Sequence, residues 1–344
     1  MATNVRRHVA LVVLFLTAIA AGAAPASAGL SITPTFDSSI TGDVNAAAIE
    51  AVINQGISVY ESSFSDPINV SILFRYSATQ PNGDPMGSFI GRSNYTLYSF
   101  TFNTYTTQLT ADAKTSSDAT AVASLPASAL APRITPSSAD GRAIGLNTPG
   151  AMDAHSNVGV GGTLDGIVTL NAGQPLQFLR DGGIAPGTYD ALRFVEHEIN
   201  EVLGLGSILP NTTDFTGNRA VRPQDLYRYS ASGIRSLTAS ANATSYFSID
   251  GGVTSLVGFN QDSGGDFGDW LSPSCSPLPK ALVQYAFSCS GQAADISLTS
   301  PEGITLDVIG YDPAAASTVP EPSSVLLVLG AATTGAAMLR RRGR

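Results

Sequence analysis

The segment from Thr188 to Gly204 has the clearest helical pattern in the chain, and it limits how the rest of the sequence can fold. His197 and Glu201 lie four positions apart, so they share one face of the predicted helix. Gly204 is a typical residue after a helix end, and Asp190 stands near the start. The opposite face is apolar, with side chains at intervals of three and four residues: Leu192, Val195, Ile199, Val202 and Leu203. The segment therefore predicts a helix that packs on a core and holds polar groups on its other side.

The polar face of this helix has the spacing of a metal site. His197, Glu198 and Glu201 form an HExxE sequence. In the HExxH sequence of zinc proteases, two histidines bind zinc and the glutamate between them acts as a general base. A carboxylate is also a zinc ligand, so we expect His197 and Glu201 to bind metal and Glu198 to accept a proton from water. The alternative is a charged helix face exposed to solvent.

The remaining metal ligands are expected to be carboxylates, because histidine is scarce. Only His155 and His197 remain once the N-terminal 28 residues are removed, and His155 lies in a Gly/Asn-rich loop typical of a surface histidine. The preferred candidates are Asp266 and Asp269, within the tight acidic turn 265–270. Zn²⁺ is the expected ion. Ca²⁺ is the alternative, because oxygen-rich Gly/Asp turns also suit calcium.

Residues 1–28 predict a secretory signal peptide. Arg6 and Arg7 precede an apolar run from Val9 to Ala21, and the small-residue sequence 26–28 follows as a cleavage site. The alternative of a transmembrane anchor is disfavoured, because the apolar run is short and ends at that cleavage site. Export through signal peptidase is therefore expected.

The charge of the remaining body excludes one class of partner. The whole chain has 18 basic and 27 acidic residues, of which six basic residues and one acidic residue lie in segments 1–28 and 320–344. The body is therefore strongly acidic. Nucleic-acid binding requires a basic face, so no nucleic-acid partner is expected.

The C-terminal segment, 314–344, is predicted to direct sorting. Pro320, Glu321 and Pro322 precede an apolar stretch at 325–339, and an arginine cluster follows it at 340–344. This order resembles the PEP-CTERM signal, which an exosortase recognises in Gram-negative bacteria. The resemblance implies export across the inner membrane, membrane attachment through a transmembrane helix before processing, and a final place at the cell surface or in the extracellular matrix. A plain C-terminal membrane anchor is the alternative.

The body itself predicts an α+β fold in two parts, 29–204 and a smaller C-terminal subdomain at 205–313. Period-two patterns predict strands, and three-and-four spacing predicts helices. Residues 77–103 are expected to form a loop that includes a short strand near 98–102, and the strand before the 188–204 helix is expected at a sheet edge. Strands are expected at 30–36, 68–76, 142–147, 165–171, 245–249 and 255–259, and helices at 43–64, 105–114, 118–125, 188–204 and 300–310.

Cys275 and Cys289 are the only cysteines, and they lie 14 positions apart. Because the chain is expected to enter an oxidising compartment, we predict that they form one structural disulfide. A two-cysteine metal site is the alternative, but the spacing lacks the close pairs typical of such sites.

Beyond the helix, the chain resembles a family of exported bacterial metalloproteases that carry an HEIxEV(L/M)G helix and often a PEP-CTERM tail. The resemblance implies a zincin-like, metzincin-related mixed sheet with an active-site helix, and metal-dependent peptidase activity. Two positions depart from the metzincin pattern, Glu201 and Ser207, where histidines would stand, and there is no methionine between Met152 and Met338. The matching segments are 35–38, 45–55, 64–68, 117–119, 196–204, 223–229, 246–252, 265–270 and 306–311.

The predicted function is therefore that of an exported hydrolase, a zinc metalloprotease acting on a peptide or protein substrate. The alternative comes from another class: a non-catalytic, adhesin-like surface or matrix protein on the same scaffold, with a structural metal or none.

Overall fold

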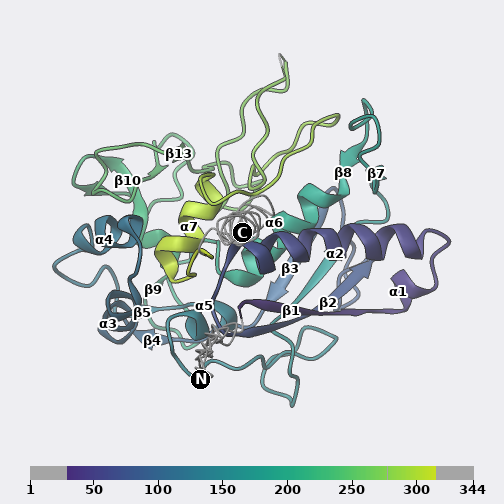
Figure 1. Cartoon of the computed structure of the whole chain (residues 1–344). Helices are drawn as coiled ribbons and strands as arrows, with labels where there is room; N and C mark the ends of the chain where they lie inside the picture. The colour runs from purple at the N-terminus through teal and green to yellow at the C-terminus, as the bar shows by residue number, and fades with distance from the viewer. Residues whose placement is uncertain (1–28, 277, 315–344) are drawn as a thin grey trace, which may run out of the picture.

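A four-stranded sheet organises the first half of the chain (Figure 1). Its strand order is β1–β2–β6–β3, with three parallel strands and an antiparallel strand, β3, at one edge. Alternating apolar residues bury one face of β2 through Val70, Ile72 and Phe74. The strands are β1 (Ser31–Phe36), β2 (Asn69–Tyr76), β3 (Gly91–Tyr95) and β6 (Gly166–Leu170).

The computed structural model describes residues 29–276 and 278–314. The predicted signal peptide at 1–28 lies outside the described residues, and so does the sorting motif at 320–322 with the segment that follows it. Among the helices of the described ranges, none has the length and apolar character needed to cross a bilayer.

Two helices, α2 (Ala46–Ser63) and α6 (Ala191–Leu203), pack together on one face of this sheet (Figure 1). Gly56 allows their close approach, because a Cβ atom at that position would lie 2.6 Å from Val195 Cγ1. Val195 and Ile199 on α6 are buried in the core, and this fixes the rotation of the helix about its axis. The packing therefore sets the direction of the HExxE face.

The remaining elements are short and surround this unit. Three smaller sheets have the orders β4–β5–β9, β7–β8 and β11–β10–β12–β13. Their strands are β4 (Phe100–Thr101), β5 (Arg133–Ile134), β7 (Leu176–Gln177), β8 (Tyr189–Asp190), β9 (Ala220–Val221), β10 (Arg228–Ala231), β11 (Ile234–Arg235), β12 (Tyr246–Phe247) and β13 (Val257–Gly258). The helices are α1 (Ser38–Thr41), α3 (Phe102–Asp112), α4 (Ser116–Ala123), α5 (Ser138–Ala143), the 3-10 helix η1 (Pro223–Tyr227) and α7 (Pro301–Ile309).

Most predicted elements are confirmed, and three predictions about strands are wrong. Residues 142–147 do not form a strand, because Ser137 Oγ caps the helix α5 by accepting from the Asp140 N–H. The predicted loop at 77–103 contains β3, whose sequence Gly-Arg-Ser-Asn-Tyr has no apolar alternation. Strand β6 is central rather than at the edge, because β2 and β3 pair with its two sides.

The predicted disulfide is confirmed. Cys275 and Cys289 are joined, with their Cα atoms 5.5 Å apart. The bond closes the loop 275–289, which follows the turn at 265–270 and contains Gln284.

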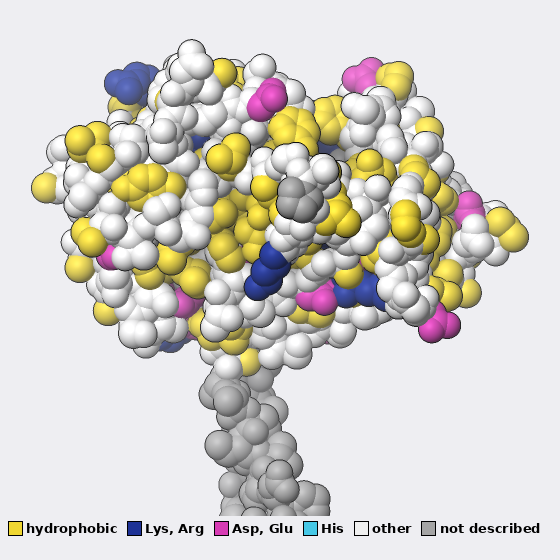
Figure 2. Space-filling model, turned by 90° about the horizontal axis from the view of Figure 1, so that it is seen from above, with side chains coloured by type: hydrophobic (Ala, Val, Ile, Leu, Met, Phe, Trp, Pro, Cys, Tyr) yellow, Lys and Arg dark blue, Asp and Glu magenta, His cyan; other side chains and the backbone are white. Residues whose placement is uncertain are grey.

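One face of the molecule has a low density of charge. Figure 2 shows hydrophobic side chains gathered near its centre, with only isolated Lys, Arg, Asp and Glu side chains around them. This face therefore presents no continuous basic surface.

Asp66 is buried where the chain after α2 meets residues 311–314. Its Oδ2 atom accepts a hydrogen bond of 2.9 Å from the Asp312 N–H. Burial is the main cause that raises the pKa of Asp66 from 3.8 to about 7; the hydrogen bond opposes this shift, and the charge of the Asp312 carboxylate adds to it. Between about pH 4 and pH 7, the folded state therefore retains a proton on Asp66 that the unfolded chain has already lost.

This proton predicts how Asp66→Asn changes the stability. Because the folded-state pKa is raised, the wild-type free energy of unfolding falls as pH rises through that window, whereas an amide has no such dependence. We expect the variant to be more stable than wild type by about 1–3 kcal/mol at pH 8, and by much less at pH 4. Urea unfolding at both pH values measures the difference. An equal difference at the two pH values would contradict the prediction.

Candidate metal centre

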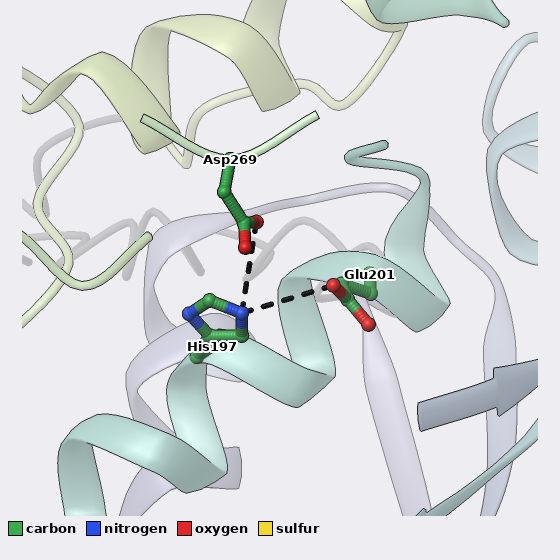
Figure 3. A group of neighbouring side chains, drawn as sticks. All are labelled: His197, Glu201 and Asp269. Atoms are coloured by element: carbon green, nitrogen blue, oxygen red, sulfur yellow. Dashed lines mark ion pairs between the residues drawn. The ribbon is translucent and has the colours of Figure 1, made fainter. Parts of the chain in front are cut away.

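Helix α6 presents His197 and Glu201 on the same side, facing a loop that carries Asp269 (Figure 3). His197 is 8% exposed, and its Nδ1 atom lies 3.0 Å from the carbonyl oxygen of Val283. Donation of Nδ1–H to this carbonyl leaves Nε2 as the free ring nitrogen on the side of the two carboxylates. The ring is therefore held in the orientation and tautomer that a metal ligand requires.

The three side chains converge on a single point. His197 Nε2 lies 3.7 Å from Glu201 Oε1 and 3.6 Å from Asp269 Oδ1. One ligand atom from each residue falls within 4.8 Å of the other two. Ligands around a tetrahedral zinc ion with bonds of 2.0–2.1 Å lie about 3.4 Å from one another. The separations are thus too long for strong direct hydrogen bonds and close to those that a shared cation produces.

Backbone contacts hold the Asp269 loop against α6. The Asp269 carbonyl accepts a 2.8 Å hydrogen bond from the Asn260 N–H, and the Gly268 carbonyl accepts one of 2.9 Å from Gln224 Nε2. Gly268 also lies directly against Gly206, so a Cβ atom at position 268 would be 2.4 Å from Gly206 Cα. The loop can approach the end of α6 this closely because both positions lack side chains.

Each metal-facing carboxylate has a second contact that orients it. Ser93 Oγ, on strand β3, donates to Glu201 Oε2, which leaves Oε1 on the side of His197. Gln284 Nε2 donates to Asp269 Oδ1 over 2.9 Å. Such partners fix the direction of the ligands and strengthen metal binding.

The electrostatics of the cluster favour a cation. Burial alone would lower the pKa of His197, but the charges of Asp269 and Glu201 hold it well above its usual value. Burial raises the pKa of Asp269 well above the ordinary range, and the charge of His197 opposes this shift. Burial would also raise the pKa of Glu201, but the charge of the neighbouring His197 and the hydrogen bond from Ser93 lower it. Protons and a divalent cation therefore compete for the same three groups.

Glu198 is buried beside this cluster and is 3% exposed. Its Oε2 atom is buried and has no hydrogen-bond partner among the described residues. Burial, followed by the charge of Glu201, raises the pKa of Glu198 well above its usual value. A carboxyl group with this environment is suited to exchanging a proton with a molecule that enters the site.

Gly91 on β3 has no side chain, and this leaves room for the Glu198 carboxylate. A Cβ atom at position 91 would lie 2.4 Å from Glu198 Oε1. We expect Gly91→Ala to displace the Glu198 carboxylate, and so to lower the peptide hydrolysis expected from the sequence by about 10–100-fold, because general-base catalysis depends on the position of the base. Zinc binding should change little, since Gly91 contacts none of the three converging ligands. Steady-state kinetics and zinc titration test the two effects, and wild-type kinetics would contradict the prediction.

A cavity of about 770 Å³ opens beside the cluster. Strand β3 forms one wall, and its outer edge pairs with no other strand among the described residues. The volume is within the range of small-molecule and peptide-binding clefts. Aromatic side chains line much of the cavity, including one from β3 itself: Phe89, Tyr95, Tyr189, Phe194, Phe267, Tyr285 and Phe287.

The predicted ligands are brought together in part. His197, Glu201 and Asp269 form the cluster, whereas Asp266 lines the same cavity and its Oδ1 accepts from the Gly268 N–H over 2.7 Å. His155 lies in an exposed loop, as expected. Sequence reasoning missed Gly91, Ser93 and Gln284. No pattern marks them, because β3 has no apolar alternation and Gln284 acts through residues distant in sequence.

Comparison with known proteins adds no relative. No protein-family model matches the chain, and neither a search of curated proteins nor a search of solved structures returns a match. The geometry of the cluster and the cavity therefore carries the functional argument alone.

Proposed function

We propose that this protein is an exported zinc-dependent peptidase with a zincin-like fold. The observation that carries the proposal is the convergence of His197, Glu201 and Asp269 beside the buried carboxylate of Glu198. A purely structural metal site has no need for an additional unpaired carboxylate or for an adjoining cavity. The parallel strands, the antiparallel edge strand and the HExxE helix on the sheet support the zincin-like assignment.

The proposed ligands fit zinc better than calcium. The cluster offers one imidazole nitrogen and two carboxylates, and both kinds of group are zinc ligands. Calcium prefers six to eight oxygen ligands and does not favour imidazole. Three ligands converge among the described residues, which is the number of protein ligands typical of a catalytic zinc site.

The residues around the site suit peptide hydrolysis. A bound zinc ion supplies Lewis acidity, which lowers the pKa of water and polarises a carbonyl group. Glu198 accepts the proton of the attacking water and then donates it to the leaving amine. The free edge of β3 can form main-chain hydrogen bonds with an extended peptide, and this places a scissile carbonyl near Glu198 and the metal ligands.

The proposal includes export, sorting by an exosortase and action at the cell surface or in the extracellular matrix. It rests on the sequence of the two terminal segments, together with the disulfide between Cys275 and Cys289, which is typical of exported proteins.

Hydrolysis of an unfolded protein substrate, such as reduced casein, tests the proposed activity. We expect cleavage by the purified protein, loss of cleavage with a chelator and recovery when zinc is restored. Zinc binding without any cleavage of a panel of unfolded proteins would contradict the peptidase and favour a structural metal. Absence of zinc binding would contradict the metal centre itself.

A further inference from the structure

A line of buried hydrogen bonds runs from helix α2 through α6 to Asp269. The Tyr60 hydroxyl lies 2.8 Å from Asn200 Oδ1, and Asn200 Nδ2 donates to Gln284 Oε1 over 3.0 Å. Gln284 Nε2 then donates to Asp269 Oδ1 over 2.9 Å. The connected side chains come from four separate parts of the sequence and lead to one metal-facing carboxylate.

The members of this line have little freedom to move. Tyr60 and Asn200 are 0% exposed, and Gln284 is 1% exposed. The backbone of Gln284 is fixed on both sides, because its N–H donates to Glu302 Oε1 and its carbonyl accepts from the N–H of Trp270. Trp270 directly follows Asp269, so this contact also sets the distance between Gln284 and the ligand it orients.

The donor and acceptor roles along this line of hydrogen bonds are determined at Asp269. With a metal bound, Asp269 is ionised and can only accept hydrogen bonds, so Gln284 presents its amide nitrogen to it, as it does in the structure. Gln284 Oε1 is then the acceptor for the amide nitrogen of Asn200, and Asn200 Oδ1 remains as an acceptor that shares the single hydroxyl proton of Tyr60 with the Glu196 carbonyl, which lies 2.7 Å from the same hydroxyl. Each amide thus has one orientation that satisfies both of its neighbours.

We propose that Gln284 is a positioning residue, which holds the Asp269 carboxylate in its metal-binding orientation through this line from Tyr60 and Asn200. The proposal rests on the metal centre of the proposed function. Asp269 lies on an irregular loop, and its carboxylate receives no other side-chain or backbone hydrogen bond within residues 29–276 and 278–314. Without Gln284, this ligand would lose the contact that sets its direction.

Zinc affinity, measured by competition with a chromophoric chelator, tests the proposal without relying on activity. Gln284→Met keeps the length of the side chain and removes its amide, and it should weaken zinc binding by about 10–100-fold. Tyr60→Phe keeps the ring and removes only the distant hydroxyl, and it should weaken binding by about 2–5-fold. The double variant should bind zinc as weakly as Gln284→Met alone, because the line is already broken.

Gln261→Met is the matched control. Gln261 is also buried, but its amide has no hydrogen-bond partner among the described residues and no link to Asp269. Zinc affinity should be unchanged in this variant. Equal weakening in Gln261→Met and Gln284→Met would overturn the proposal, because it would indicate a general loss of packing.

Two further outcomes separate this inference from the proposed function. Wild-type affinity in Gln284→Met, or in Tyr60→Phe if Gln284→Met does not fold, overturns the positioning role and leaves the metal centre intact. Absence of zinc binding by the wild-type protein overturns both.

Discussion

Replacement of Glu198 by Gln is expected to lower kcat for peptide hydrolysis by about 10³-fold while zinc affinity stays within a few-fold of wild type. The amide fills the same space beside Gly91 but cannot accept a proton from water. Because Glu198 is not one of the three converging ligands, the metal should be retained. Kinetics of the zinc-loaded variant, with metal content measured on the same sample, separate catalysis from binding.

Glu50→Gln is a suitable control for the removal of one carboxylate. Glu50 lies on α2, outside the cavity, and should tolerate the change without a kinetic effect. Wild-type kcat in Glu198→Gln would exclude Glu198 as the general base.

Replacement of His197 by Ala is expected to weaken zinc binding by about 10²–10⁴-fold. Protein zinc sites bind with about 10–16 kcal/mol, so one ligand of three accounts for about 3–5 kcal/mol. Hydrolysis should be lost together with the metal, and equilibrium dialysis against zinc measures the affinity. The imidazole is 8% exposed, and its loss leaves two carboxylates without the cation that balances them.

His155→Ala provides the matched control, because His155 is the other histidine of the body and lies in an exposed loop. It should bind zinc as wild type does. A His197→Ala protein that keeps wild-type zinc affinity would place the metal elsewhere.

The sequence predicts the main elements of the fold where periodicity is strong. The helix α6, the strands β1 and β2 and the final helix α7 all have regular apolar spacing, and the structure confirms them. Strand β3 could not be predicted from its sequence, because an edge strand beside a cavity is held by pairing with β6 and by polar side chains. Helix α5 could not be predicted, because it is short and contains two turn-forming residues, Asp140 and Gly141.

The same distinction applies to the site. The pair His197 and Glu201 follows from helical spacing, because a helix places residues four apart on one face. Asp269 could be proposed as a carboxylate in an acidic turn, but spacing cannot distinguish it from Asp266. That distinction depends on the packing of Gly268 against Gly206, and on Gln284, which lies 15 positions beyond Asp269.

In the proposed peptidase, strand β3 would link peptide binding to the positions of Glu198 and Glu201. Gly91 and Ser93 lie two positions apart, so they face the same side of the sheet, toward Glu198 and Glu201. A peptide that pairs with the free edge of β3 would restrain the strand that carries the Ser93 hydroxyl and the space for Glu198. One inserted residue before Gly91 would therefore exchange the two faces of β3 and turn Arg92 toward helix α6.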